Sequence, residues 1–287
     1  MKKTGFLLLC VLTIAVMFSL TAHADMGPKP SVVIDFNGLD GKTYYATLLA
    51  SEKTTGPYTA LNANKGNAHY VEGDEDYEIF LKFAEYHDAE GYSFLQFFKD
   101  CTKTHQFSWT YYPPQVFKIL LYFPKTDHFI VSDDRYERYA FDSYFTVQIS
   151  DTSLSAAKSY DYTNETLSLI VRILLTIAVE LAIALLFGFQ ERKQFRFIIL
   201  VNVITQIALN LALNIINYCA GELAFVVSYV LLEVGVFIAE AILYTWYLKK
   251  RNSKEIPGWK PGVYALVANA ASFALGLGLV YWIPGIF

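Results

Sequence analysis

Four long apolar stretches in the C-terminal half of the chain constrain its fold more than any other feature. They cover residues 167–189, 197–216, 223–248 and 263–283. Each reaches the roughly 20 residues that a helix needs to cross a hydrocarbon core about 30 Å thick. Backbone N–H and C=O groups must be paired within the chain in lipid, so such stretches form helices. The sequence therefore predicts an all-α bundle of four transmembrane helices within residues 167–287.

The basic residues between these stretches predict how the bundle is oriented. They are Arg192, Lys193 and Arg196 in the first link, and Lys249, Lys250, Arg251, Lys254 and Lys260 in the third. The middle link, residues 218–222, contains no Lys or Arg. Positively charged loops stay in the cytoplasm. We therefore expect a multi-pass protein of the cell membrane, with two cytoplasmic loops and its C-terminus outside.

Residues 1–24 have the pattern of a secretory signal peptide. Lys2 and Lys3 form a basic start, an apolar run follows, and Ala22 and Ala24 supply small side chains ahead of a cleavage site. A retained membrane anchor is the alternative interpretation. A signal at this end predicts that the segment after it is extracytoplasmic, in agreement with the basic loops.

The charge of the chain follows the same division. Residues 25–165 contain 12 Lys+Arg and 21 Asp+Glu, whereas residues 166–287 contain 9 and 6. The formal net charge of the whole chain is -4, and nucleic acid is not an expected partner because phosphate binding needs a basic face. With 54% hydrophobic and 17% charged residues, the composition also excludes a disordered chain.

The exported segment, residues 25–149, has the pattern of a mainly β, sandwich-like domain with a helical insertion. Alternating apolar residues and turn-forming Asn-Gly and Asp-Gly pairs predict a hairpin between residues 31–36 and 43–50. A helical period covers residues 74–90, and the helical region continues after a break over residues 92–101. Further strands are expected at residues 116–123, 128–132 and 139–149, followed by a polar linker at 150–166.

Aromatic residues are frequent in this domain and have two interpretations. Trp109, Tyr111 and Tyr112, beside two prolines, are candidates for a stacking surface that binds a glycan or a peptide. The alternative is that such rings fill the core while the tyrosine hydroxyls reach water. The spacing of His, Cys and acidic residues matches no metal site or catalytic motif, so neither a metal nor a cofactor is predicted.

Polar residues inside the apolar stretches are the candidate site of the membrane half, because lipid cannot satisfy them. They are Glu180, Glu233 and Glu240 and the amides Asn202, Gln206, Asn210 and Asn214. Glu233 and Glu240 differ by about 20° around their helix and share one face. This face either binds a proton or a cation, fixes helix packing, or pairs with a partner subunit. Asn269 is alone in the fourth stretch and does not define a site.

Two cysteines follow the predicted signal, Cys101 in the exported domain and Cys219 in the middle link. Both are expected on the oxidising side of the membrane, where a disulfide forms readily. A bonded pair and two free thiols are both consistent with the sequence.

Three segments resemble a group of uncharacterised bacterial membrane proteins. These segments are Asp25-Met-Gly-Pro-Lys-Pro-Ser31, Tyr111-Tyr-Pro-Pro-Gln-Val-Phe-Lys118 and Arg138-Tyr-Ala-Phe-Asp-Ser-Tyr144. Members of the group join a secreted β-rich domain to several C-terminal transmembrane helices and have no assigned activity. The resemblance implies the same architecture and a bacterial cell envelope, and it adds no catalytic residue.

These features lead to two functional hypotheses. In the first, the extracytoplasmic domain binds or senses an envelope component, and the bundle anchors it or docks a membrane partner or a second copy of the chain. In the second, the chain is a small proton or cation transporter, or a channel component, that uses the Glu and Asn/Gln faces. No catalytic residue is predicted, so an enzyme is the least supported class.

Overall fold

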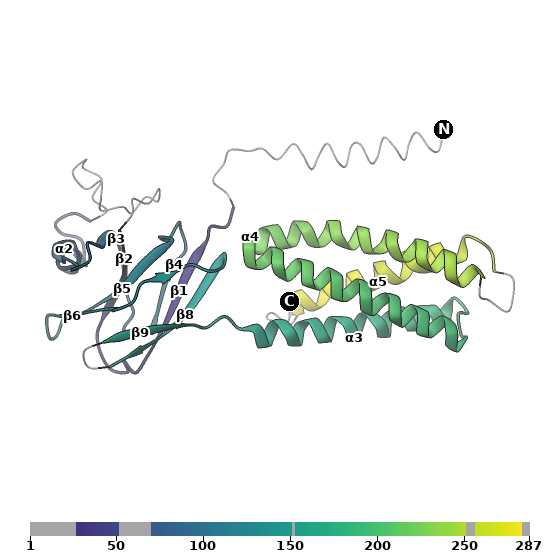
Figure 1. Ribbon diagram of the computed structural model, residues 1–287, viewed down its shortest axis with the longest axis horizontal. Helices are drawn as coiled ribbons and strands as arrows, with labels where there is room; N and C mark the ends of the chain where they lie inside the picture. The colour runs from purple at the N-terminus through teal and green to yellow at the C-terminus, as the bar shows by residue number, and fades with distance from the viewer. Residues whose placement is uncertain (1–26, 52–69, 151–152, 251–255, 283–287) are drawn as a thin grey trace, which may run out of the picture.

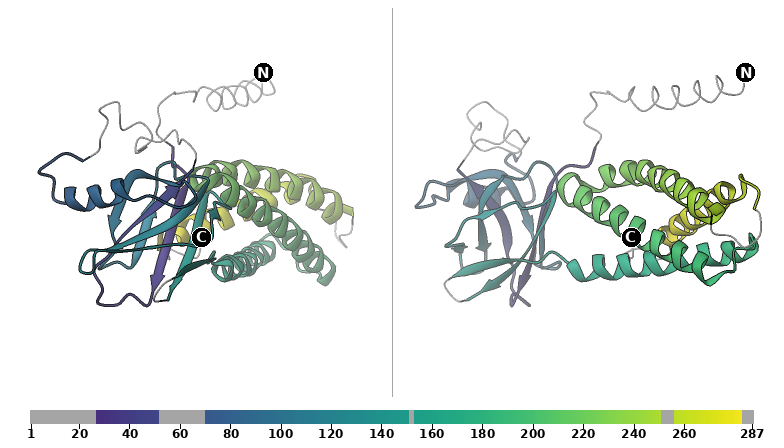
Figure 2. Two further views of the ribbon diagram at one scale, coloured as in Figure 1. Left: turned by 60° about the vertical axis from the view of Figure 1, so that its left-hand side comes forward. Right: turned by 45° about the vertical axis from the view of Figure 1, so that its right-hand side comes forward.

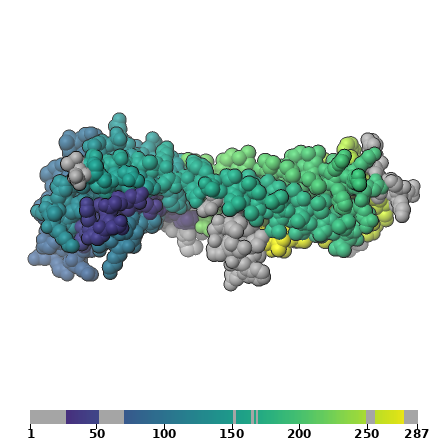
Figure 3. All heavy atoms as spheres, turned by 90° about the horizontal axis from the view of Figure 1, so that it is seen from below, coloured from purple at the N-terminus to yellow at the C-terminus, as the bar shows by residue number. Residues whose placement is uncertain are grey.

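The computed structural model describes residues 27–51, 70–150, 153–250 and 256–282. A β-rich part and a helical part lie end to end in an elongated molecule (Figure 1, Figure 3). The described helices are α2 (Tyr77–Glu85), α3 (Tyr162–Leu186), α4 (Arg192–Lys250) and α5 (Lys260–Trp282). The prediction of a β-rich part followed by helices is confirmed. The predicted signal peptide, residues 1–24, lies outside the described residues.

The β-rich part contains two sheets. The strands are β1 (Ser31–Asn37), β2 (Tyr45–Ala50), β3 (Ser93–Asp100), β4 (Gln106–Trp109), β5 (Val116–Phe123), β6 (His128–Val131), β7 (Tyr136–Glu137), β8 (Asp142–Ile149) and β9 (Leu154–Lys158). One sheet has the order β4-β1-β8-β9, and the other has the order β3-β2-β5-β6 with β7 also paired to β5. The β1–β8 pair is parallel, and the other ladders are antiparallel.

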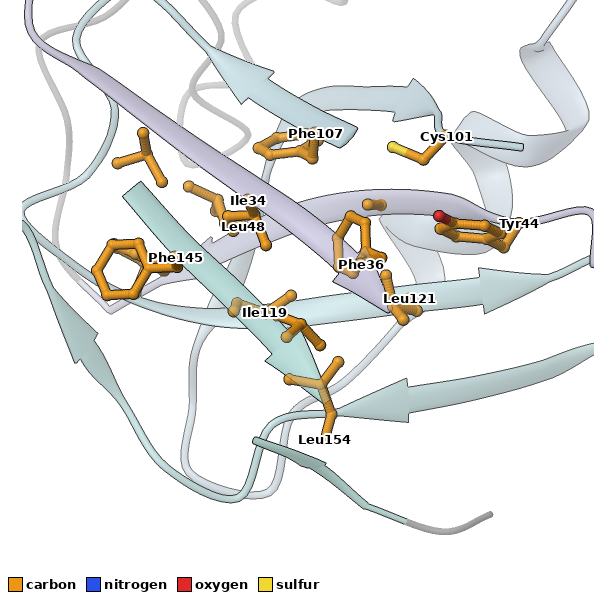
Figure 4. Close-up of a cluster of buried hydrophobic side chains, with 14 of the residues drawn as sticks. Ile34, Phe36, Tyr44, Leu48, Cys101, Phe107, Ile119, Leu121, Phe145 and Leu154 are labelled. Carbon is orange, nitrogen blue, oxygen red and sulfur yellow. The ribbon is translucent and has the colours of Figure 1, made fainter. Parts of the chain in front are cut away.

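The main core lies between the two sheets (Figure 4). Alternate residues of β1 and β8, such as Ile34 and Phe145, meet Leu48 and Ile119 from the opposite sheet. This is the packing that alternating apolar residues produce when two sheets face one another. Strand β5 is buried along nearly its whole length because its second face is covered as well.

A second, aromatic core covers that other face of β5. Helix α2 places Phe83, which is fully buried, against Phe94, Phe98 and Tyr122 of the sheet. The ring centroids of Phe83 and Phe94 lie 5.4 Å apart. The predicted helical insertion is therefore present, and it forms a third layer over one sheet.

A buried ion pair closes the edge of this layer. The ammonium of Lys118, on β5, lies 3.3 Å from both Asp88 and Glu90, and the side chains of Lys118 and Asp88 are only 5% and 3% exposed. Burial alone would lower the pKa of Lys118, but hydrogen bonds and the charges of the two carboxylates outweigh it and raise that pKa. The two contacts of Lys118 hold the loop between α2 and β3 against the sheet.

The predicted hairpin between residues 31–36 and 43–50 is wrong. Strands β1 and β2 have the expected alternation but belong to different sheets. Their connection contributes Leu39 and Tyr44 to the core, at 1% and 0% exposure, so the chain crosses from one sheet to the other. Alternation fixes which face of a strand is buried and does not fix its neighbour.

Two other expectations for this part are also wrong. Residues 93–100 form strand β3 rather than an extended helix, because Leu95 enters the main core while Phe94 and Phe98 enter the aromatic core. Burial on both faces removes the polar spacers that would have indicated a strand. The expected linker at 150–166 contains β9, which pairs with β8, and the first turn of α3.

The helical part follows β9 after a short connection. Two of its helices are long and apolar enough to cross a membrane, over Leu169–Leu186 in α3 and Arg192–Leu248 in α4. Within α4, Gly221 has φ 80° and ψ −179°, and the helix reverses there. Its two arms run back side by side (Figure 1, Figure 2), so that the rings of Phe197 and Tyr247 stack at 3.8 Å. The second and third apolar stretches are thus the two arms of α4.

Candidate functional site

Seven polar side chains gather between the helices, at a distance from the bend of α4. We call them the polar cluster: Glu180 of α3, Asn202 and Thr205 of the first arm of α4, Glu240 and Tyr244 of the second arm, and Tyr264 and Asn269 of α5. Glu180, Asn202, Glu240, Tyr244 and Tyr264 are fully buried. Buried polar groups in lipid or in a protein core need partners, and most of these groups have them.

Glu180 occupies one half of the cluster. Its Oε2 atom accepts hydrogen bonds from Asn202 Nδ2 at 2.6 Å, Tyr244 Oη at 3.2 Å and Tyr264 Oη at 3.4 Å. Its other oxygen, Oε1, accepts none from the N–H and O–H groups of the described residues. The hydrogen bonds that neighbouring N–H and O–H groups donate to this carboxyl are therefore all on one oxygen.

Glu240 occupies the other half. Thr205 Oγ1 donates to Glu240 Oε1 at 2.7 Å, and Asn269 Nδ2 donates to Glu240 Oε2 at 2.7 Å. The carboxyls of Glu240 and Glu180 also lie within hydrogen-bond reach of one another. The cluster thus connects α3, both arms of α4 and α5 through hydrogen bonds.

A small polar cavity lies on the side of the cluster nearer to the bend. Its volume is about 30 Å³, and its lining includes Arg172, Gln206, Asn210, Tyr229 and Glu233. Arg172 Nη1 donates to Asn210 Oδ1 at 3.1 Å, and Asn210 Nδ2 donates to the Gln206 carbonyl at 2.8 Å. A cavity of this size and polarity has room for water.

The polar candidates of the helical part therefore separate into two groups. Glu180, Glu240 and Asn202 meet in the polar cluster, whereas Glu233, Gln206 and Asn210 line the cavity. Asn214 lies in the first arm of α4 and lines neither. Glu233 and Glu240 share a helix face as predicted, but the carboxyl that pairs with Glu240 is Glu180.

Sequence reasoning missed Tyr264 and undervalued Asn269. Asn269 looks isolated in its own helix, yet its amide donates to Glu240 of another helix. Tyr264 stands close to the end of its apolar stretch, which is also a usual position for an interfacial tyrosine. Its hydroxyl instead reaches the backbone carbonyl of Glu180 at 3.3 Å.

The aromatic candidates of the β-rich part have different environments. Trp109 is 2% exposed, and its Nε1 donates to the Tyr111 carbonyl at 2.8 Å. It therefore belongs to the core and cannot offer its ring to a ligand. Tyr112 is 38% exposed, lies edge-to-face with Tyr111 and has the ammonium of Lys29 5.3 Å from its ring. Tyr111 and Tyr112 remain accessible candidates.

The two cysteines are separate and free. Cys101 is fully buried in the core of the β-rich part, whereas Cys219 is exposed beside the bend of α4. Burial raises the pKa of the Cys101 thiol to about 12, which keeps it protonated and unreactive. The disulfide left open by the sequence is not formed.

The β-rich part contacts the helices at the bend of α4, in a region that we call the junction. It consists of Tyr139, Phe141, Tyr160, Tyr218 and Gly221. The Phe141 N–H donates to the Tyr218 carbonyl at 2.8 Å. The Tyr218 ring lies 5.5 Å from Tyr160 and 6.3 Å from Tyr139. A side chain at position 221 would meet the Phe141 ring at 2.5 Å, so glycine is required for this contact.

No match to the chain was found among family models, curated proteins or solved structures. Within the described residues, no group of three or more His, Cys, Asp or Glu side chains is arranged to hold a metal ion. The polar cluster, the cavity and the junction are the features of this chain that bear on its function.

Proposed function

We propose that the chain is an integral membrane protein of a bacterial cell envelope with four membrane-spanning segments. Each arm of α4 is about 43 Å long at 1.5 Å per residue, enough to cross a 30 Å hydrocarbon core with some tilt. The apolar side chains on the outside of these helices, among them Leu174, Leu211 and Ile242, are more than half exposed, as lipid contact requires. The basic links put residues 190–196 and 249–260 in the cytoplasm and the β-rich part outside.

The proposed role is to bind or sense an envelope component outside and to convey its binding to the bundle. The observation that carries this role is the junction, where the Phe141 backbone and ring contact Tyr218 and Gly221 at the bend of α4. A second connection is covalent, because only three residues separate β9 from α3. A domain held at two points transfers a change in its own structure to the helices.

The candidate ligands are glycans and peptides, and Tyr111 and Tyr112 are the candidate binding residues. Tyr112 offers a partly exposed ring next to a cation, an arrangement suited to stacking against a sugar face or a peptide side chain. The bundle anchors this domain and docks a membrane partner or a second copy of the chain. Internal satisfaction of most of the polar cluster supports a packing role for those side chains.

The test uses the full chain in lipid nanodiscs, screened against defined glycans and short peptides. The proposal expects binding that Tyr112→Ala weakens at least tenfold, together with a change in hydrogen exchange at residues 218–222. A matched variant, Gly221→Ala, should retain binding and lose the change at the bend. Binding without any response at residues 218–222 would contradict the coupling, and absence of any binding would contradict the role itself.

The second candidate function is proton or cation transport, and one observation favours it. Glu233 lines the polar cavity and lies two helical turns from Glu240 of the polar cluster. Ionisable side chains are therefore present at successive positions along the inside of the bundle. The test is proton and cation flux in proteoliposomes, compared with the Glu233→Gln plus Glu240→Gln variant. Flux that is absent from the wild type, or unchanged in the variant, would exclude this candidate.

A further inference from the structure

The hydrogen bonds of the Glu180–Glu240 pair are unequally distributed over its four carboxyl oxygens. Glu180 Oε2 accepts three hydrogen bonds, and each oxygen of Glu240 accepts one from a neutral side chain. Glu180 Oε1 is fully buried and accepts none from the N–H and O–H groups of the described residues. A buried carboxyl oxygen without a hydrogen-bond donor destabilises the folded state unless it carries a proton of its own.

The close approach of the two carboxyls makes the same demand. Two carboxyl groups hydrogen-bond to one another only when a proton lies between them, because two carboxylates repel. The groups that face the pair carry no compensating positive charge. From the first arm of α4 they are Asn202 and Thr205, from the second arm Tyr244, and from α5 Tyr264 and Asn269. Arg172 of α3 lies at the polar cavity, where it contacts Asn210 and interacts with Glu233.

We propose that Glu180 and Glu240 form a proton-binding site, in which one proton is held by Glu180 Oε1 and shared with Glu240. This proton fastens α3 to the second arm of α4. The site binds a proton and no larger cation, because amide and hydroxyl donors already occupy the positions around both Glu240 oxygens and around Glu180 Oε2. The proposal does not depend on the sensing role or on transport.

Loss of the proton leaves two negative charges in contact inside the bundle. The pair then separates, and the contact between α3 and α4 weakens. Stability contributed by the proton is therefore complete while the proton is bound and is lost as pH rises through the point where it leaves. Gln at position 180 supplies a permanent N–H donor to Glu240, so Glu180→Gln should remove this pH dependence.

The experiment is infrared spectroscopy of the full chain in nanodiscs at neutral pH, with ¹³C-glutamate to assign the carbonyl stretch of protonated carboxyls. We expect a glutamic acid band in the wild type that loses the intensity of one carboxyl in both Glu180→Gln and Glu240→Gln. Glu233→Gln is the matched control, since it removes an intramembrane carboxyl of the same helix and leaves the pair intact. Absence of the band from the wild type, or unchanged intensity in either pair variant, overturns the proposal.

Thermal unfolding keeps the proposal testable if a variant does not fold. The wild type and Glu233→Gln should lose several degrees of melting temperature as pH is raised above neutral, in parallel with loss of the infrared band. A melting temperature of the wild type that stays constant while the band disappears overturns the fastening role. If it folds, the Glu180→Gln variant should keep its neutral-pH melting temperature as the pH is raised.

Discussion

Replacing Gly221 by alanine is expected to detach the β-rich part from the bend of α4. Gly221 has φ 80° and ψ −179°, a backbone conformation that is essentially restricted to glycine. Holding alanine there costs about 1–3 kcal/mol. The added Cβ would also lie 2.5 Å from Cδ1 and Cε1 of Phe141, so the ring must move. Its movement removes the packing contact of the junction.

The assay is thermal unfolding of the full chain in nanodiscs, combined with limited proteolysis near residues 159–161. We expect a loss of about 1–3 kcal/mol in the free energy of unfolding. Cleavage between β9 and α3 should be faster, because this connection gains freedom once the junction opens. Adding Phe141→Ala removes the clash but not the backbone strain, so the double variant should be less destabilised than the two single changes combined.

Gly235→Ala is the matched control in the same helix. An added Cβ at position 235 has no atom within 4 Å, and alanine has the higher helix propensity. This variant should be as stable as the wild type or slightly more stable. If Gly221→Ala matched it in stability and in cleavage rate, the junction would not be the contact that joins the two parts.

Three further predictions concern the ion pair, the aromatic core and the cysteines. Lys118→Met should lower the free energy of unfolding by about 3–5 kcal/mol, because it leaves the buried Asp88 without its positive partner. Since folding raises the pKa of Lys118, the stabilisation of the wild type is present below the ordinary lysine pKa and is lost as pH rises through the folded pKa. Urea unfolding at several pH values measures both effects. Phe83→Ala should cost about 3–5 kcal/mol in the same assay, because it empties the centre of the aromatic core, and a loss under 1 kcal/mol would contradict that packing. A membrane-impermeant maleimide should label Cys219 in intact cells and leave Cys101 unmodified until the chain is unfolded, whereas labelling of Cys219 only after lysis would reverse the proposed orientation.

The helical part was predictable because its helices are apolar over long stretches, two of them long enough to cross a membrane. The apolar stretches correspond to α3, the two arms of α4 and α5, and their ends differ from the ends of the helices by a few residues. The backbone geometry of the reversal at Gly221 was not predictable, since a short polar link indicates a turn without giving its backbone angles. Strands β5, β6 and β8 lie within segments where strands were expected.

Pairings were the part that sequence could not supply. The periodicity that identifies β1 and β2 as strands is the same whether they pair with each other or face each other across a core. The same limit applies to the candidate site. A helical wheel places Glu233 and Glu240 on one face, but the pairing of Glu240 with Glu180 depends on the relative position of two helices. Tyr264 joins the cluster for the same reason.

The most direct test of the account places a photo-crosslinking phenylalanine analogue at position 141 of the full chain in native membranes. The Phe141 ring lies against Gly221, and its backbone N–H is bonded to the Tyr218 carbonyl. We expect an intramolecular crosslink to residues 218–222, identified by mass spectrometry, and Gly221→Ala should reduce it. Crosslinks confined to the β-rich part, or to other proteins, would contradict an extracytoplasmic domain docked on the bend of α4.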